Sequence, residues 1–354
     1  MPDPRRVPLY PLRFAPILQY RVWGGRRLAD LLATPVPAEG HVGEAWLLSD
    51  RPDHQSHVAA GPLTGRTLRQ LLEDYPEQMM GDLVNRFPRF PLLLKFLDAH
   101  DMLSVQVHPS DHQTDCLPPG ESGKTEAWVV LEAGPESHIY AGLAPGSTPD
   151  GLRQARRSGT LTDHLVSFTP KVGDVVFLPA GTVHTLGGNI VAFEIQQNSD
   201  VTFRLYDWDR VDPTTGRGRS LDIARALACI DFNQGAVGPV TPRVDTTVPV
   251  TRERLVECEY FSLWRVHGQA AFTVGAPGAP RVLICVAGAG QIEHQGAAYA
   301  IATGDVVLLP AAVGACVLRP SALVTVLEAA LPLPSTLRDA GPAAGAGTPG
   351  VAGR

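Results

Sequence analysis

Residues 173–185 read G-D-V-V-F-L-P-A-G-T-V-H-T, and residues 304–316 read G-D-V-V-L-L-P-A-A-V-G-A-C. Each copy has a Gly-Asp turn, an apolar run typical of a buried strand, and a proline that ends the strand. Two such copies indicate two versions of the same folding unit. When the copies are aligned without gaps, His184 falls on Ala315, so only the first copy retains a potential metal ligand.

The composition favours an all-β sandwich or barrel. Its 35 glycines and 32 prolines separate short apolar runs at intervals typical of strands and turns. The length of 354 residues favours more than one domain. Together with the repeated motif, this predicts a first barrel (1–230), a linker (231–248), a second, degenerate barrel without metal ligands (249–331) and a disordered Ala/Gly/Pro-rich tail (332–354).

Apolar periodicity and turn signals predict the local structure of the first barrel. The expected helices are 67–75, 151–157 and 221–230. The first of them has Thr67 as an N-terminal cap. The expected hairpins join 125–132 to 137–143 and 174–186 to 190–197.

Charge and cysteine usage exclude several classes of protein. A net charge of −6 without a basic stripe argues against a nucleic-acid partner. No stretch approaches the ~18 uninterrupted apolar residues that span a bilayer, and the start M-P-D-P-R-R-V-P is unlike a signal peptide. The five cysteines are scattered and never form C-x-x-C, so we expect reduced thiols and a cytoplasmic protein.

Four side chains from distant segments form a candidate metal site. In S-V-Q-V-H-P (104–109), Gln106 and His108 are two positions apart, so they share one face of a strand. If the strands line one barrel, Glu126 and His184 converge on the same point. Two imidazoles, a carboxylate and an amide oxygen suit a divalent metal, zinc first.

Taken singly, each of these residues has an ordinary structural alternative: a satisfied hydrogen-bond partner, a core or capping histidine, half of a salt bridge, or an exposed loop residue. Their joint occurrence favours metal binding. His112 is a rival ligand at i+4 from His108, but Pro109 breaks the helix that this spacing requires.

Two lysines are candidate substrate-binding groups. Lys124 shares a strand face with Glu126, where it can hold an anionic group or transfer a proton if its pKa is depressed. Lys95 is the one charge in the apolar run F-P-L-L-L-K-F-L (90–97), so it either reaches the surface or points into a cavity.

Arg204 is the third basic candidate, in the segment D-V-T-F-R-L-Y-D-W-D-R (200–210). Its structural alternative is a surface ion pair with Asp207 or Asp209.

Three long motifs resemble type I mannose-6-phosphate isomerases, and the short bacterial branch is the closer match. They are F-P-L-L-L-K-F-L-D-A-H-D-M-L-S-V-Q-V-H-P-S-D (90–111), G-K-T-E-A-W-V-V-L (123–131) and P-A-G-T-V-H-T-L-G-G-N-I-V-A-F-E-I-Q-Q-N-S-D-V-T-F-R-L-Y-D-W-D-R (179–210). The likeness begins at R-V-W-G-G (21–25) and covers roughly residues 8–230.

The resemblance implies a double cupin barrel with helical insertions and one zinc ion per chain. It assigns the zinc to Gln106, His108, Glu126 and His184. It also implies that Arg204 is catalytic and that Lys124 lies in the substrate pocket. Ser110 and His112 depart from the acidic H-P-D-D-E pattern of this motif, just beyond the ligands.

The implied reaction interconverts mannose 6-phosphate and fructose 6-phosphate through a cis-enediol. Zinc would act as a Lewis acid, and Arg204 would stabilise the developing oxyanion. Lys124, Glu126 and a metal-bound water remain alternatives for the base. The substrate's phosphate docks on basic residues at the pocket mouth, where Lys124, Arg204 and Lys95 are candidates.

Two other functions stay open at this level. One is a different metal-dependent cupin enzyme such as a dioxygenase, which usually draws on a richer set of imidazoles. The other is a non-catalytic sugar-binding or regulatory cupin. A monomer and a homodimer both remain compatible with the sequence.

Overall fold

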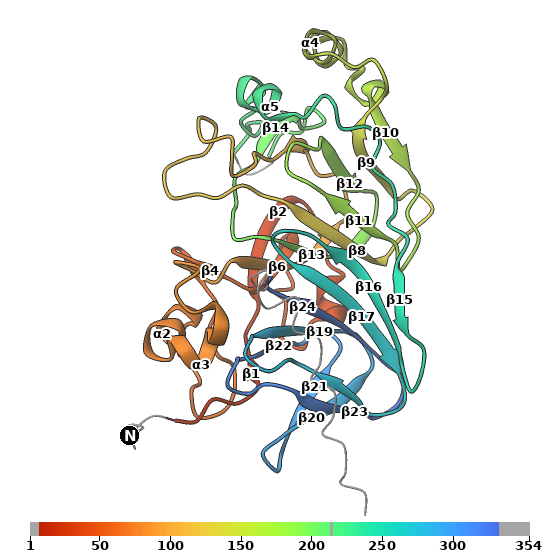
Figure 1. Cartoon of the computed structure of the whole chain (residues 1–354). Coiled ribbons are helices and arrows are strands. Elements are labelled where there is room, and N and C mark those ends of the chain that lie inside the picture. The colour runs from red at the N-terminus through yellow and green to blue at the C-terminus, as the bar shows by residue number, and fades with distance from the viewer. Residues whose placement is uncertain (1–6, 213–214, 333–354) are drawn as a thin grey trace, which may run out of the picture.

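The structure is a computed structural model that describes residues 7–212 and 215–332. Its strands build two β-units, which lie above one another in Figure 1. The predicted tail, apart from Pro332, lies outside the described residues. The longest helix in the described ranges has ten residues, so none of them could cross a bilayer.

The first unit consists of two facing sheets. The six-stranded sheet has the order β11 (Val175–Leu178), β8 (Glu126–Glu132), β13 (Ile190–Gln197), β6 (Leu92–Ala99), β2 (Ile17–Gly25) and β3 (Val42–Leu48). The five-stranded sheet has the order β10 (Leu165–Phe168), β9 (His138–Leu143), β12 (His184–Gly187), β7 (Val105–Val107) and β14 (Phe203–Tyr206).

The second unit also has two sheets. The seven-stranded sheet has the order β1 (Leu12–Arg13), β22 (Val306–Leu309), β19 (Arg281–Ala287), β24 (Val324–Ala330), β17 (Ser262–Gly268), β16 (Thr251–Glu257) and β15 (Arg243–Thr246). The four-stranded sheet has the order β18 (Phe272–Val274), β23 (Cys316–Pro320), β20 (Ala289–His294) and β21 (Ala297–Ala302). A short ribbon pairs β4 (Asp50–Arg51) with β5 (His54–Gln55).

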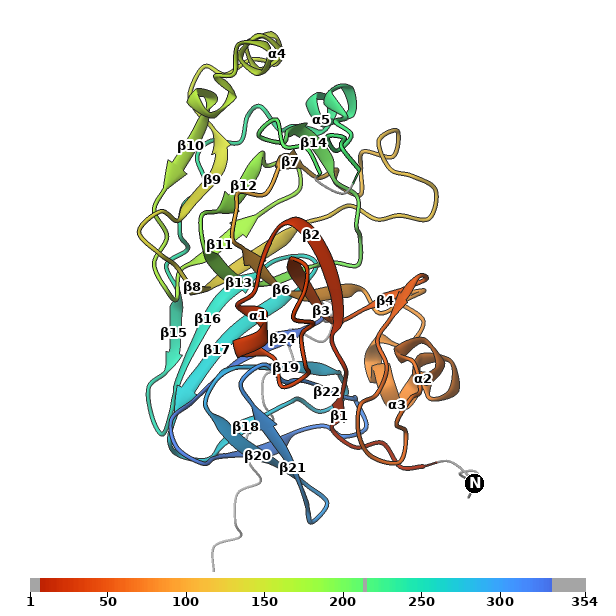
Figure 2. The same ribbon diagram turned by 180° about the vertical axis from the view of Figure 1, so that it is seen from behind.

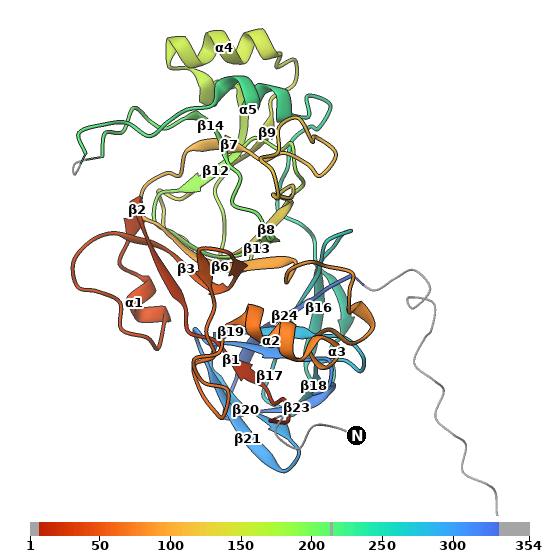
Figure 3. The same ribbon diagram turned by 90° about the vertical axis from the view of Figure 1, so that its left-hand side faces the viewer.

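Short helices lie between the strands along the chain. They are α1 (Leu28–Leu31), α2 (Leu68–Asp74), α3 (Pro76–Met80), α4 (Pro149–Ser158) and α5 (Ile223–Cys229), with 3-10 turns at Gly81–Leu83 and Leu161–His164. All three predicted helices are present, and Thr67 caps α2 in a capping box with Gln70. In Figure 3, α4 and α5 lie at the far end of the first unit, and α2 and α3 lie near the second.

The repeated G-D-V-V motif forms equivalent strands in the two units. Its copies are β11 and β22, and the glycine before each strand has a positive φ, 91° at Gly173 and 89° at Gly304. Glycine adopts this conformation without strain, which explains why both copies begin with it. The all-β prediction with two related units is confirmed.

The two predicted hairpins are wrong. β8 pairs with β11 and β13, whereas β9 pairs with β10 and β12, so the turn between β8 and β9 carries the chain from one sheet to the other. β12 and β13 likewise belong to different sheets. Turn residues show where the chain reverses, but the pairing depends on which sheet each apolar face must cover.

The boundaries between the parts differ slightly from those expected. β15 lies inside the predicted linker 231–248 and pairs with β16, so the end of that segment extends a sheet of the second unit. At the other end of the chain, β1 pairs with β22 and adds an N-terminal strand to the same sheet. Figure 2 shows this N-terminal segment running beside both units.

Close packing of β2 on β3 explains the first glycine of the R-V-W-G-G motif. A Cβ on Gly24 would lie 2.4 Å from the backbone nitrogen of Gly43. Any larger residue would push these strands apart, and β2 supplies part of the wall of the site described next.

Candidate metal and substrate site

Three buried side chains converge inside the first unit. His108 follows β7, Glu126 begins β8 and His184 begins β12, so both sheets contribute. One ligand atom from each lies within 4.8 Å of the others. The alternation of β7 turns His108 inward together with Gln106, while Val105 and Val107 pack in a separate apolar cluster.

Both imidazoles are held in the tautomer that a metal ligand needs. Nδ1 of His108 donates to the carbonyl of Val201 at 2.8 Å, and Nδ1 of His184 donates to that of Thr182 at 2.9 Å. In both residues this contact directs Nε2 to the interior of the site. Burial, together with the charge of Lys124, holds the pKa of His108 well below its usual range, so this imidazole is neutral at neutral pH.

Glu126 supplies a buried negative charge. Burial alone would raise its pKa, but the Lys124 ammonium beside it, at 3.0 Å, and the two histidines outweigh that effect and hold the pKa of Glu126 well below its usual range. His184 Nε2 lies 3.2 Å from the other carboxylate oxygen. Neither oxygen has a hydrogen bond of good geometry, which leaves both available to a cation.

Gln106 completes the set from the neighbouring strand. Its Nε2 lies 3.3 Å from Nε2 of His184, and its Oε1 accepts a hydrogen bond from Ser104 at 3.2 Å. An amide binds metals through oxygen, so Gln106 can become a ligand only when its amide is turned over. The rival ligand His112 is exposed and is not part of the buried cluster.

Lys124 lies in direct contact with this cluster. Its ammonium donates to Nε2 of His108 at 3.2 Å and pairs with Glu126. The prediction that Lys124 and Glu126 face the same way is confirmed by this contact. A metal ion bound here would take the place that the Lys124 ammonium and the Gln106 amide nitrogen occupy beside the Nε2 atoms of the two histidines.

The donor set fits a divalent cation. Two imidazoles with Nδ1 engaged elsewhere, and a buried carboxylate whose oxygens lack a hydrogen bond of good geometry, form the N/O environment that zinc accepts.

A pocket of about 440 Å³ opens beside the cluster. Its polar lining comes from β2, β3, β7, β13, β14 and the segments next to them: Tyr20, Arg21, Glu44, Ser104, Gln106, Lys124, Glu194, Asp200, Thr202, Arg204, Asp212 and Arg219, with the apolar side chains Val22, Trp23, Leu97 and Leu103. Another pocket of similar volume, at Phe87–Pro91, has a mostly apolar wall and contains none of the predicted site residues.

Lys95 does not line the pocket. It is buried, with its ammonium 3.1 Å from Glu194 and 3.9 Å from Glu44, and these two carboxylates do line the pocket. Lys95 therefore neither reaches the surface nor points freely into a cavity. Its direct contact with substrate stays a prediction, and its visible role is to hold two carboxylates of the pocket wall.

Glu194 is a functional candidate that the sequence analysis missed. On β13 it is the register partner of Lys95 on β6, and it also accepts a hydrogen bond from Trp128 at 2.9 Å. The signal was present, because Glu194 is a single charge inside the apolar run I-V-A-F-E-I (190–195). Two such isolated charges of opposite sign in buried strands predict a buried pair.

Arg204 projects into the same pocket from β14. Its register partner on β7 is Gln106, so the guanidinium lies on the strand next to the metal candidates. Burial, and then the charge of Arg219, lower the pKa of Arg204. Its Nε is buried without a hydrogen-bond partner among the described residues, which leaves donors for a substrate. The expected ion pair with Asp207 is absent in the described ranges, where Asp207 binds other arginines.

Comparisons with known proteins agree on one family. Residues 12–124 match the model for the phosphomannose isomerase type I catalytic domain, and residues 251–323 match that for the mannose-6-phosphate isomerase cupin domain. The mannose-6-phosphate isomerase ManA of Bacillus subtilis is 35% identical over 86% of this chain and 94% of its own. That of Streptococcus mutans is 35% identical over 85% and 92%.

A solved structure supports the same relationship. The crystal structure of the mannose 6-phosphate isomerase from Bacillus subtilis superposes with a TM-score of 0.83 at 29% identity. The match covers 91% of this chain and 99% of the other.

Proposed function

The chain belongs to the type I mannose-6-phosphate isomerase family of aldose–ketose isomerases, and we propose that it uses one zinc ion and a cis-enediol to interconvert mannose 6-phosphate and fructose 6-phosphate. The observation that carries the metal proposal is the convergence of two buried imidazoles and a buried carboxylate on one point. We propose that these residues, His108, Glu126 and His184, hold the ion together with Gln106.

When bound, the ion supplies Lewis acidity next to the substrate's carbonyl and hydroxyl oxygens. The rest of the chemistry falls to side chains of the pocket wall. Moving a proton between C1 and C2 leaves negative charge on oxygen, so the site must offer fixed positive charge where that oxygen lies. Arg204 is placed for this role because its guanidinium is half-buried, cationic and unpaired in the described ranges.

The proton must pass through a group close to both carbons. A carboxylate whose pKa is held well below its usual range is a weak base, which favours Glu126 as a ligand and not as the proton carrier. Lys124 lies 3.0 Å from Glu126 and lines the pocket, so it can reach the reacting carbons. We propose Lys124 as the proton-transfer group. We also propose that Lys95 orients Glu194 in the pocket wall.

One experiment tests this proposal as a whole. The purified enzyme is analysed for bound metals by elemental analysis, and the same sample is assayed for conversion of mannose 6-phosphate before and after treatment with a chelator. We expect about one zinc per chain, loss of turnover on chelation and recovery on adding zinc. Undiminished turnover in a metal-free sample would remove the metal from the mechanism.

A further inference from the structure

A second group of charges lies at the end of the pocket formed by the chain after β14. Arg219 lines the pocket there, and its partner is the buried carboxylate of Asp207. We propose that Arg219, positioned by Asp207, binds the phosphate group of the hexose phosphate. This inference rests on the proposed function of the same site and adds a residue that determines specificity.

The geometry of the pair presents Arg219 as a fixed anion receptor. Its Nε donates to Oδ2 of Asp207 at 2.8 Å, and its Nη2 donates to Oδ1. This two-point contact uses one edge of the planar guanidinium and fixes its orientation. Nη1 remains on the other side, available to an oxyanion in the pocket.

The local charge balance favours a dianion. Asp207 also accepts a hydrogen bond from Arg210, so the trio of Arg210, Arg219 and Asp207 carries a net positive charge, which Asp200 and Asp212 of the same wall oppose. Arg204 adds a further cation close enough for Arg219 to lower its pKa. A phosphate monoester carries about −1.5 to −2 charges at neutral pH, and it would relieve this repulsion.

Two other cations of the pocket wall are already paired with carboxylates. Arg21 makes a two-point contact with Glu44 at 2.9 and 3.1 Å, and Lys124 pairs with Glu126 inside the metal cluster. Neither has positive charge to spare. This differs from the Arg219 group, in which the cations outnumber the carboxylate that they share.

Position also separates Arg219 from Arg204. Arg204 lies on β14 directly beside Gln106, next to the metal candidates, which suits the reacting end of the sugar. Arg219 enters the pocket from the chain that follows β14 and precedes α5. An extended hexose phosphate has its C1 and C2 at one end and its phosphate at the other, so the two arginines suit opposite ends.

Two carboxylates at this part of the wall, Asp200 and Asp212, would repel a phosphate that approached them. Asp200 is exposed and Asp212 half-exposed, so water and salt screen their charge. Carboxylates in such positions are suited to accept hydrogen bonds from sugar hydroxyls.

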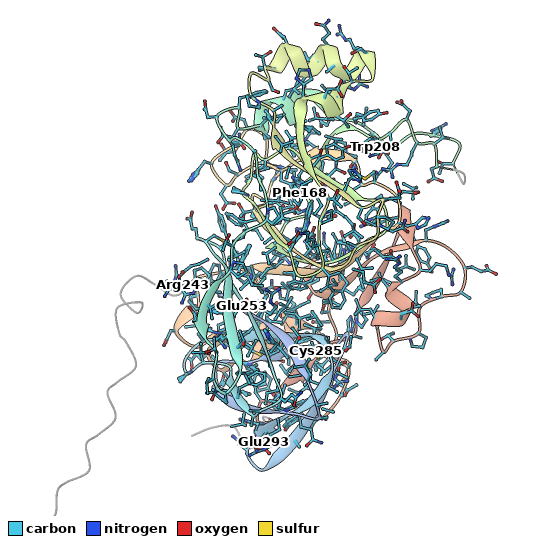
Figure 4. The ribbon with its side chains drawn as sticks, turned by 90° about the vertical axis from the view of Figure 1, so that its right-hand side faces the viewer. Phe168, Trp208, Arg243, Glu253, Cys285 and Glu293 are labelled. Atoms are coloured by element: carbon cyan, nitrogen blue, oxygen red, sulfur yellow. The ribbon has the colours of Figure 1, made fainter. Side chains whose placement is uncertain are left out.

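The backbone next to Asp207 is strained in a way that fixes this carboxylate. Trp208 and Asp209 are consecutive non-glycine residues with φ of 58° and 52°. The indole of Trp208 donates to the carbonyl of Leu103 at 2.6 Å, which holds the turn against the pocket wall. Figure 4 shows Trp208 in the first unit. Strain of this kind persists where the surroundings impose it, and it is common at binding sites.

The test uses the metal-loaded enzyme and three variants, Arg219→Ala, Arg219→Lys and Asp207→Asn. We measure KM and kcat for mannose 6-phosphate and, by calorimetry, the affinity for inorganic phosphate. Losing a charge-assisted contact should raise KM about 10- to 100-fold in Arg219→Ala and weaken phosphate binding by a similar factor, with a smaller change in kcat. Arg219→Lys should recover part of the loss.

Arg225→Ala is the matched control, because Arg225 also pairs with a nearby aspartate, Asp222, but does not line the pocket. It should leave KM and phosphate affinity unchanged. Asp207→Asn should raise KM, because Asp207 positions Arg219. In the double variant its effect on KM should not add to that of Arg219→Ala.

The outcomes separate the two proposals. If the wild type isomerises mannose 6-phosphate but Arg219→Ala and Arg219→Lys bind phosphate like the wild type, Arg219 is not the phosphate residue. If the wild type binds phosphate through Arg219 but does not turn over the sugar, the phosphate site stands and the proposed reaction fails. Unfolding curves show which variants are folded. If Arg219→Ala does not fold, the phosphate affinity of Arg219→Lys decides whether Arg219 binds phosphate.

Discussion

Gln106 and His184 face each other across the neighbouring strands β7 and β12, with 3.3 Å between their Nε2 atoms. On the other side of β7, Arg204 of β14 is also the register partner of Gln106. One row across a single sheet therefore carries an imidazole, an amide and a guanidinium. A substrate lying along this row would meet the metal candidates and the fixed positive charge together.

Replacing either imidazole should remove both the metal and the activity. His108→Ala and His184→Ala each delete one of the two imidazole donors, and the remaining donors leave a site with too few ligands. Metal content by elemental analysis and turnover of mannose 6-phosphate should fall together. His112→Ala is the control, because His112 is exposed and lies only a few residues from His108. Full activity in a metal-depleted His184→Ala enzyme would contradict the metal model.

Arg204→Lys should retain the metal but lose turnover. A lysine keeps the charge but not the planar, multi-donor head that can hold an oxyanion in one orientation. By analogy with the loss of one oxyanion donor, kcat should fall about 100-fold with bound zinc unchanged. Arg225→Lys controls for a surface effect, since Arg225 is exposed. An unchanged kcat in Arg204→Lys would restrict Arg204 to a structural role.

Much of the site could be predicted from local patterns. Period-two alternation placed Gln106 with His108 and Lys124 with Glu126, and the structure has each pair on one side of its segment. These predictions need only local geometry, because His108 and Lys124 lie one or two residues beyond β7 and β8. The repeated G-D-V-V motif predicted two related units, because a turn glycine followed by a strand can be recognised from the local sequence.

Other features depended on tertiary pairing and could not be predicted. The prediction of a β8–β9 hairpin failed because the turn between these strands passes from one sheet to the other. Glu194 was missed because its importance comes from Lys95, which is adjacent only through the β13–β6 register. Arg219 was missed because Asp207 orients it across a loop whose length hides their contact.

Lys95→Met should destabilise the fold. Lys95 lies between Glu194 and Glu44, so its removal leaves two buried carboxylates near each other without their shared cation. Removing one partner of a buried ion pair costs about 3–5 kcal/mol in the free energy of unfolding. Urea unfolding at pH 7 measures this loss. The double variant Lys95→Met/Glu194→Gln should recover part of the stability, and no recovery would mean that Glu194 does not depend on Lys95.

Glu44 should make the stability of the protein fall in acid. Burial alone would raise its pKa, but Lys95 and Arg21 outweigh burial and lower the pKa to about 2. Because the folded-state pKa lies below the unfolded value of about 4.5, the stabilisation is complete above pH 4.5 and is lost as the pH falls towards 2. The shift corresponds to roughly 3 kcal/mol at pH 7.

The Glu44→Gln variant isolates this contribution. It should be less stable than the wild type at pH 7, and the difference in the free energy of unfolding should shrink steadily between pH 4.5 and 3, measured by urea titration at each pH. Glu293→Gln is the control, because Glu293 pairs with Arg319 at the exposed end of the second unit (Figure 4). Its difference from the wild type should stay small at every pH. A difference for Glu44→Gln that does not change with pH would mean that its carboxylate is not held ionised by Lys95 and Arg21.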